Sequence, residues 1–408
     1  MIDEEEAGMT RETTTYKPRL IRDKGFYKML VTLALPVTVQ NIIVFLTQML
    51  DTVMLGELGD VAMSASSLAN QPFFIFNMLT FGLGSGAAVL TAQYWGMQQL
   101  KPIRVIVTMI IRFSMLAGLL LTVAVLAVPE WFMGLFTNEA EVISTGAEYL
   151  RIIAYCYVFF GLTNVFYISI RSVESVRIAV VSNVAALVTN VLLNYILIFG
   201  KFGAPALGIR GAAYATLAAR LLEFTIAVCY MFFFDQNLRI RLRDFFLFDR
   251  LLLRDLTVIS IPVVANELMW ALGTSMQARL LGMLGTSAVA ANTIISVVQQ
   301  LSTVAVFGVA SAAAVLIGKA IGEGDMNKAH DRGHTFLLIS YLRADCHGGN
   351  PGAPAGRCRL LQGGASHQGA GASNDAGGRT DRLFRFHFRD RDCRHFARRR
   401  GYKIFALD

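Results

Sequence analysis

The feature that most constrains this chain is a series of long apolar windows. A membrane-spanning helix needs about 20 consecutive apolar residues, and eight windows reach this length, near residues 30–56, 62–95, 104–128, 147–170, 178–200, 211–234, 255–282 and 287–318. Only 16% of the 408 residues are charged, too few to cover the surface of a soluble protein of this size. We therefore predict an all-α membrane protein with a polytopic helical bundle, and we do not expect an enzyme.

The distribution of Lys and Arg predicts the orientation of the chain in the membrane. These residues crowd the N-terminal segment 1–27 and the loops after the second, fourth, sixth and eighth windows. The predicted loop after the fourth window contains Arg171 and Arg177. Since positive loops stay in the cytoplasm, we predict a multi-pass protein of the plasma or inner membrane with a cytoplasmic N-terminus. The acidic start of the chain lacks the basic region of a signal peptide, so the first helix is expected to act as the targeting signal.

The sequence repeats itself at an offset of 226 residues. Residues 36–103 align without a gap to 262–329, and 17 of the 68 pairs are identical. They include an apolar-window proline and three glycines in each copy: Pro36 and Pro262, Gly56 and Gly282, Gly59 and Gly285, Gly96 and Gly322. Because one offset contains six windows, an even number, the copies share their orientation. We predict two parallel-repeat lobes related by an axis along the membrane normal, the first at 28–234, joined by a cytoplasmic loop at 235–254 to the second.

The composition changes abruptly at residue 341. Residues 341–408 hold 12 Arg, 1 Lys, 6 Asp and 11 Gly, where a complete second lobe would continue with helices nine to twelve. The change falls inside a ninth apolar stretch, which begins at Thr335, so we interpret 341–408 as a shifted reading frame and not as a domain. The alternative is a basic tail that binds RNA or anionic lipid. On the first interpretation, 255–340 is only the start of the second lobe, and no nucleic acid is expected as a partner.

Two common kinds of site are missing from the sequence. The five cysteines form no C-x-x-C motif, which argues against a zinc site or a disulfide framework. The glycine-rich segment 82–86 lies in an apolar window and lacks the Lys-Ser/Thr of a phosphate-binding loop. We therefore expect no cofactor, and an ATP-driven pump is disfavoured.

Several segments in order resemble the multidrug and toxic compound extrusion (MATE) transporters of the NorM type. They are Leu35-Pro36, LDTVMLG at 50–56, YLRI at 149–152, LNYILIFG at 193–200, GIRGAA at 208–213 and NELMWALG at 266–273. The resemblance implies two six-helix lobes around a central cleft. It also implies the export of bulky organic cations in exchange for Na⁺ or H⁺.

Asp51 is the first candidate for ion coupling, because a carboxylate within a membrane helix is costly and usually functional. Gln40, Thr47 and Asp51 are spaced to share one helix face, which predicts a polar stripe directed into the lobe. The alternative is that Asp51 only anchors the helix end near Gly56. Pro36 is expected to allow a kink about 22 Å away along the helix, and the resemblance implies that this kink responds to protonation of the aspartate.

Further polar residues are candidates for the cleft. Asn183, Asn190 and Asn194 have the same spacing and share a face; the resemblance places the last two beside Asp51, and the alternative is a helix-packing cluster. Glu267, five residues after Pro262, is the second coupling candidate. In the resembling family, the glutamate lies where this chain has Trp270. Polar lining of the second repeat is predicted for Asn292, Gln299 and Thr303.

We therefore predict a secondary active multidrug antiporter that works by alternating access. Its partners are the lipid bilayer and small organic cations, for which Met269, Trp270 and Met276 are possible apolar contacts, and we expect a monomer. One alternative is a flippase for lipid-linked sugars with the same two lobes, which would favour a basic cavity able to hold pyrophosphate. The other is a non-transporting remnant, which the loss of the last helices would favour.

Overall fold

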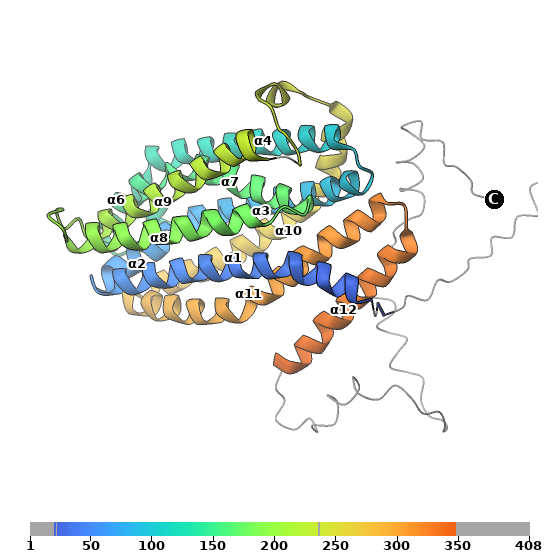
Figure 1. The fold of residues 1–408 in the computed structure, drawn as a ribbon. Helices are drawn as coiled ribbons and strands as arrows, with labels where there is room; N and C mark the ends of the chain where they lie inside the picture. Colours follow the sequence, from blue (N-terminus) through green and yellow to red (C-terminus); the bar gives the residue numbers. More distant parts are fainter. Residues whose placement is uncertain (1–19, 22, 236, 348–408) are drawn as a thin grey trace, which may run out of the picture. The chain divides into compact units, whose positions relative to one another are not determined.

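Long helices follow the apolar windows of the sequence. The computed structural model describes residues 20, 21, 23–235 and 237–347, and most of them are helical (Figure 1). The helices are α1 Lys24–Gly56, α2 Asp60–Ala69, α3 Gln71–Gly96, α4 Leu100–Ala127, α5 Pro129–Gly134, α6 Ala140–Ile153, α7 Cys156–Ser172, α8 Arg177–Phe199, α9 Ile209–Cys229, α10 Arg250–Met283, α11 Thr286–Gly322 and α12 Met326–His347. A π-helix at Tyr230–Phe234 and a 3₁₀ helix at Leu242–Phe246 complete the elements. In this part of the chain, six spans are long and apolar enough to cross a membrane, or seven with one bent pair.

Two of the windows are interrupted. The second window is divided at Asn70 into α2 and α3, which count together as one span. The fourth is divided between Ile153 and Cys156 into α6 and α7, which are bent by 56°. The oxygen atoms freed by such a break need partners, and the hydroxyl of Thr122 on α4 donates to the carbonyl of Ala154 at 2.8 Å.

The two copies of the sequence repeat have corresponding structural features. α1 and α10 both contain an interior proline, at Pro36 and Pro262. The next helix of each copy begins after a glycine with the same backbone conformation, φ 104° and ψ 170° at Gly59 and φ 110° and ψ 167° at Gly285. A side chain is strained at such positive φ angles, which explains why both copies keep glycine there.

Equivalent residues of the two copies lie next to each other. The hydroxyl of Thr293 on α11 donates to that of its repeat partner Ser67 on α2 at 3.1 Å. At the other end of these helices, a Cβ atom on Gly96 would lie 2.9 Å from the Cα atom of its repeat partner Gly322. Accordingly, α1 packs on α11 and α3 packs on α10. These reciprocal contacts define a pseudo-two-fold axis between α2–α3 and α11.

Two apolar clusters hold the described helices together. The larger lies mainly in the first repeat, around the fully buried side chains of Leu150 and Tyr157, and also includes Val289 of α11. The smaller joins Phe26 and Leu33 of α1 to Leu316 of α11 and Phe336 of α12. The second cluster crosses the boundary between the repeats and helps to fix α1 against α11 (Figure 1).

One expectation about the loops is wrong. Arg171 belongs to the last turn of α7 and is largely enclosed by protein, so it is not a loop residue. Hydrogen bonds to Gln40 and Ser311 offset the cost of burying the Arg171 guanidinium group. Both partners are more than a hundred residues away in the sequence, so they could not be predicted from the residues around Arg171. The helix α12 continues to His347, past residue 341, where the composition of the sequence changes. The segment 348–408, and with it the interpretation of a shifted frame, lies outside the described residues.

Candidate functional site

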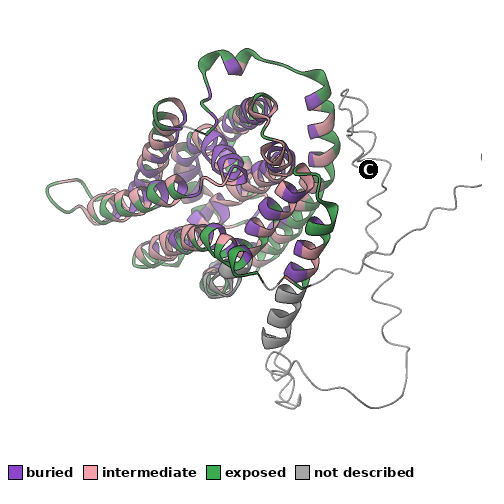
Figure 2. Cartoon of the chain, turned by 45° about the vertical axis from the view of Figure 1, so that its right-hand side comes forward, coloured by how far each residue is buried: buried purple, intermediate pink, exposed green. Residues whose placement is uncertain are grey.

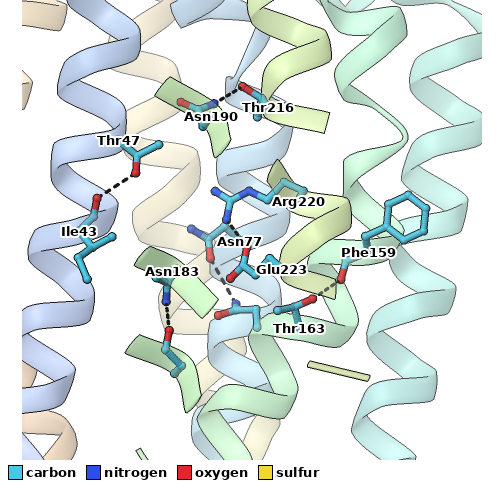
Figure 3. A network of polar contacts seen from close by, with 12 residues as sticks. Ile43, Thr47, Asn77, Phe159, Thr163, Asn183, Asn190, Thr216, Arg220 and Glu223 are labelled. Carbon is cyan, nitrogen blue, oxygen red and sulfur yellow. Dashed lines mark hydrogen bonds and ion pairs between the residues drawn. The ribbon is translucent and has the colours of Figure 1, made fainter. Parts of the chain in front are cut away.

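A chain of hydrogen bonds connects three helices of the first repeat at Asp51. The amide nitrogen Nδ2 of Asn194 donates to Oδ1 of Asp51 at 2.5 Å and to Oδ1 of Asn190 at 3.1 Å. Nδ2 of Asn190 in turn donates to the hydroxyl of Thr216 at 3.3 Å (Figure 3). Asp51 lies on α1, both asparagines on α8, and Thr216 on α9. The asparagines are one helical turn apart, so the same face of α8 presents both toward α1.

The amide oxygen of Asn194 is available for a further partner. Asn194 is fully buried, and its Oδ1 atom has no hydrogen-bond partner in the described part of the chain. A buried oxygen without a partner is costly, and this one belongs to the amide that binds Asp51. A carboxylate beside a free amide oxygen is suited to a proton or to a small hard cation, both of which prefer oxygen partners.

Two of the residues predicted for this site make only local hydrogen bonds. Nδ2 of Asn183 donates to the carbonyl of Ala179 at 2.7 Å, one turn back on α8. The hydroxyl of Thr47 donates to the carbonyl of Ile43 at 2.9 Å, one turn back on α1. Figure 3 shows both bonds beside the Asn190–Thr216 contact. Asn183 is nevertheless buried with Asn190 and Asn194, as a shared inward face requires.

A buried ion pair next to this network was not predicted from the sequence. Nη1 of Arg220 and Oε2 of Glu223, one turn apart on α9, are 2.7 Å apart (Figure 3). The guanidinium group also lies 5.3 Å from the ring centre of Phe160 and 6.0 Å from that of Phe73, within the range of cation–π attraction. Arg220 interacts electrostatically with Asp51. The available signal was two charged residues inside the apolar window 211–234.

Asparagines of α3 and α7 extend the polar interior of the first repeat. Nδ2 of Asn164 on α7 donates to the hydroxyl of Thr80 at 2.9 Å and to Oδ1 of Asn77 at 3.4 Å. Asn77 lies near Arg220 and Glu223 in Figure 3. This pair was not predictable from the sequence because the two asparagines lie on different helices, and neither forms a polar stripe by itself.

Gln40 makes its contact away from the Asp51 network. Its Oε1 atom accepts from Nη2 of Arg171 at 3.2 Å, and Nη1 of Arg171 donates to the hydroxyl of Ser311 at 2.8 Å. The arginine therefore links α1 of the first repeat to α11 of the second. The adjacent Glu174 forms an ion pair with Lys319 of α11, so two polar contacts join the repeats near this end of α7.

The candidates of the second repeat make fewer contacts. Glu267 and Asn292 are half-buried and have no hydrogen bond or ion pair among the described residues. Met269, Trp270 and Met276 are exposed, and the ring centre of Trp270 lies 5.7 Å from that of Phe74. The side chains of Gln299 and Thr303 lie outside the described residues. The structure thus assembles a polar centre around Asp51 and does not bring Glu267 into it.

Comparisons with known proteins agree with this architecture. The MatE family model matches residues 36–196 and 262–344. The probable multidrug resistance protein NorM of Thermotoga maritima is 30% identical over 307 residues, which cover 74% of this chain and 64% of that protein. The probable multidrug resistance protein YoeA of Bacillus subtilis is 24% identical over 314 residues, covering 75% and 67%. The chain therefore spans about two thirds of these relatives.

Solved structures share the fold. A MOP superfamily transporter from Pyrococcus furiosus superposes with a TM-score of 0.69 at 22% identity, covering 77% of this chain and 69% of that one. The eukaryotic MATE transporter AtDTX14 gives a TM-score of 0.68 at 19% identity, covering 78% and 71%. At these identities the similarity concerns the fold alone.

Proposed function

Because this chain belongs to the MatE family of multidrug transporters, we propose that it is a secondary antiporter that exports organic cations in exchange for Na⁺ or H⁺ bound at Asp51. The observation that carries the proposal is the hydrogen bond between Asp51 and the buried amide of Asn194. A carboxylate on a membrane-spanning helix is retained chiefly for function. The carboxylate of Asp51 has a hydrogen-bond partner, the amide of Asn194, that can respond to its charge.

The amide of Asn194 can distinguish two states of Asp51. When the carboxylate is charged, the amide N–H is the favourable partner, and the 2.5 Å contact between Nδ2 of Asn194 and Oδ1 of Asp51 supports this arrangement. When Asp51 holds a proton or lies beside Na⁺, an oxygen atom is the better partner, and the free Oδ1 of the same amide can supply it. Rotation of this amide would pass the change to Asn190 and Thr216 on the neighbouring helices.

The charges around Asp51 favour competition between cations. Arg220 is neutralised by Glu223, so the three ionised groups carry one net negative charge. A coupling ion or an organic cation balances this charge, but both together exceed it. Binding of one would therefore weaken binding of the other, which is the condition for exchange. Glu267 is proposed as a second coupling group that acts from the second repeat.

The interface between the repeats provides a route for alternating access. Reciprocal contacts surround the pseudo-two-fold axis, and the prolines Pro36 and Pro262 lie inside the helices α1 and α10 that border it. A proline removes a backbone hydrogen bond and allows bending. We propose that α1 and α10 bend at these positions while the lobes rock. The Glu174–Lys319 pair would break in the other state.

Transport by the full chain in proteoliposomes tests this proposal. Ethidium efflux is followed under an imposed proton gradient or an imposed sodium gradient, and the gradient that drives it identifies the coupling ion. Asp51→Asn removes the charge and keeps the shape of the side chain. Since a hydrogen bond to a charged group contributes about 1.5–3 kcal/mol, we expect ion-driven efflux to fall about tenfold or more.

Asp60→Asn is the matched control, because it makes the same chemical change at an exposed position in the first turn of α2. Its efflux should equal that of the unmodified chain. If Asp51→Asn retains full ion-driven efflux, the proposed role of Asp51 is wrong. If the unmodified chain moves ethidium under neither gradient, the antiporter proposal is wrong, and the non-transporting alternative is favoured.

A further inference from the structure

The segment between α9 and α10 is fixed along the side of α4. Three α4 side chains, each one turn after the last, donate to its carbonyl groups: Arg104 to Leu238 at 2.5 Å, Thr108 to Asp244 at 3.2 Å and Arg112 to Leu247 at 2.8 Å. Eight residues of helix correspond to about 12 Å. Residues 237–249, which we name the strap, therefore run beside the bundle from the start of α4 toward its middle (Figure 1).

Hydrogen bonds to three aspartates within or next to the strap give it a defined shape. The carboxylate of Asp235 accepts from the backbone N–H groups of Asn237 at 3.1 Å and Leu238 at 3.3 Å. Asp244 accepts from the N–H of Arg241 at 2.8 Å, and Asp249 accepts from the N–H of Leu251 at the start of α10, also at 2.8 Å. Each of these three carboxylates is therefore already engaged by backbone donors.

The exposed residues of the strap include several large apolar side chains. Leu238 and Ile240 are buried against the bundle, whereas Phe246 is 87% exposed and Leu242 is 69% exposed. Phe233, in the last turn before the strap, is 80% exposed. Most of this region is exposed, as the green segment at the top of Figure 2 shows. Large apolar side chains gathered in this way mark a contact surface.

The exposed side chains of this region also include a cluster of arginines. Arg239, Arg241 and Arg243 are exposed, and Arg250 and Arg254 follow in the first turns of α10. The side chains of Arg239, Arg243, Arg250 and Arg254 make no hydrogen bond or ion pair with the residues that the structure describes. Arginine binds phosphate oxygens with its planar donors and stays charged near apolar surroundings.

The exposed residues of α4 that follow its contact with the strap are also apolar. Arg112, which holds Leu247, is followed on α4 by the exposed apolar residues Phe113 and Leu116. On a membrane-spanning helix such residues face lipid acyl chains. The apolar face of the strap is therefore continuous with the lipid-facing surface of α4.

From this continuity and the charge of the strap, we propose that the strap is a binding site for anionic phospholipids at the membrane surface. Phe246 and Leu242 insert at the boundary between headgroups and acyl chains, and Arg239, Arg241 and Arg243 bind the phosphate groups. Three arginines favour an anionic headgroup over a zwitterionic one, because each cation near the surface adds to the attraction. The strap would then couple lipid composition to the position of α10, whose first residues it holds.

A tryptophan reporter tests the proposal with the full chain in lipid vesicles. Phe246→Trp is compared with Phe202→Trp, an equally exposed phenylalanine in the loop after α8, which carries no arginine cluster. Vesicles contain either brominated phosphatidylglycerol or brominated phosphatidylcholine, and the fluorescence of the unmodified chain is subtracted. We expect the Phe246→Trp reporter to be quenched about twofold more by the anionic lipid, and the Phe202→Trp reporter to show no preference.

Removing the charges completes the test. In the Phe246→Trp background, Arg239→Gln, Arg241→Gln and Arg243→Gln together should abolish the preference for the anionic lipid. The control triple Lys24→Gln, Lys28→Gln and Lys101→Gln removes three exposed cations outside the strap and should leave the preference unchanged. Equal quenching by both lipids, or loss of the preference in both triple variants, would overturn the proposal. A reporter that neither lipid quenches would place the strap in water and also overturn it.

Discussion

The contact between Gly96 and Gly322 gives the most direct test of the paired repeats. A Cβ atom at Gly322 would lie 2.8 Å from the carbonyl carbon of Gln93, and closer still to its oxygen. Ordinary contact begins near 3.4 Å, and both partners are backbone atoms that cannot turn away. In Gly322→Ala, α3 and α11 must therefore separate. Overpacking of this kind costs about 1–3 kcal/mol, so we expect a clear loss of stability in unfolding by sodium dodecyl sulfate in mixed micelles.

A matched control separates the contact from the general effect of replacing glycine. Gly273 lies inside α10 with no atom within 4 Å of its Cβ position, so Gly273→Ala should be neutral or stabilise by about 0.5–1 kcal/mol. Gly96→Ala should destabilise as Gly322→Ala does. The double variant should cost less than the sum of the two, because one separation of the helices relieves both clashes. If Gly322→Ala behaves like Gly273→Ala, the close approach of the repeats is refuted.

Three other perturbations have expected outcomes. Glu174→Lys should lower the thermal midpoint by breaking its ion pair with Lys319, a loss of up to about 1 kcal/mol, and the exchange Glu174→Lys with Lys319→Glu should recover it; no recovery would refute the pairing. Glu223→Gln should cost about 3 kcal/mol in the same unfolding assay because Arg220 stays buried without its partner, whereas a cost below that of Asp60→Asn would contradict the ion pair. Burial raises the pKa of the Asp235 carboxyl, so its contribution to stability is complete below its ordinary value of 3.8 and is lost as the pH rises. The thermal midpoint of the unmodified chain should therefore fall relative to that of Asp235→Asn as the pH rises above about 4, and parallel curves would contradict this expectation.

The helical fold and the repeat could be predicted from the sequence because each depends on local patterns. Hydropathy over about 20 residues is enough to indicate a span, and α1, α4, α8, α9 and α10 follow their windows. The glycines Gly59 and Gly285 could be paired by their spacing alone, and both occupy the strained turn that favours glycine. The bend of 56° between α6 and α7 was not predictable, since an apolar window looks the same whether its helix is straight or broken.

The polar centre was predictable only in part. Spacing placed Asn190 and Asn194 on one face of α8, and the resemblance placed that face near Asp51; the structure joins Asn194 to Asp51. The same kind of spacing grouped Gln40 with Asp51, although Gln40 binds Arg171 instead. Residues of one helix face that lie several turns apart contact different neighbours, and the sequence of one helix does not specify those neighbours.

The sequence by itself determined that this chain is a helical membrane protein built from a parallel repeat. Composition, the length of the apolar windows and the spacing of the repeat can all be measured along the chain, without knowing which residues meet in space. Only the tertiary structure decided which polar groups meet: Glu174 with Lys319, Arg171 with Ser311, and the strap with α4. A buried polar group must find a partner, but the partner is chosen by the rotation and crossing of whole helices. That choice depends on contacts between residues more than a hundred positions apart, such as the 140 positions that separate Arg171 from Ser311.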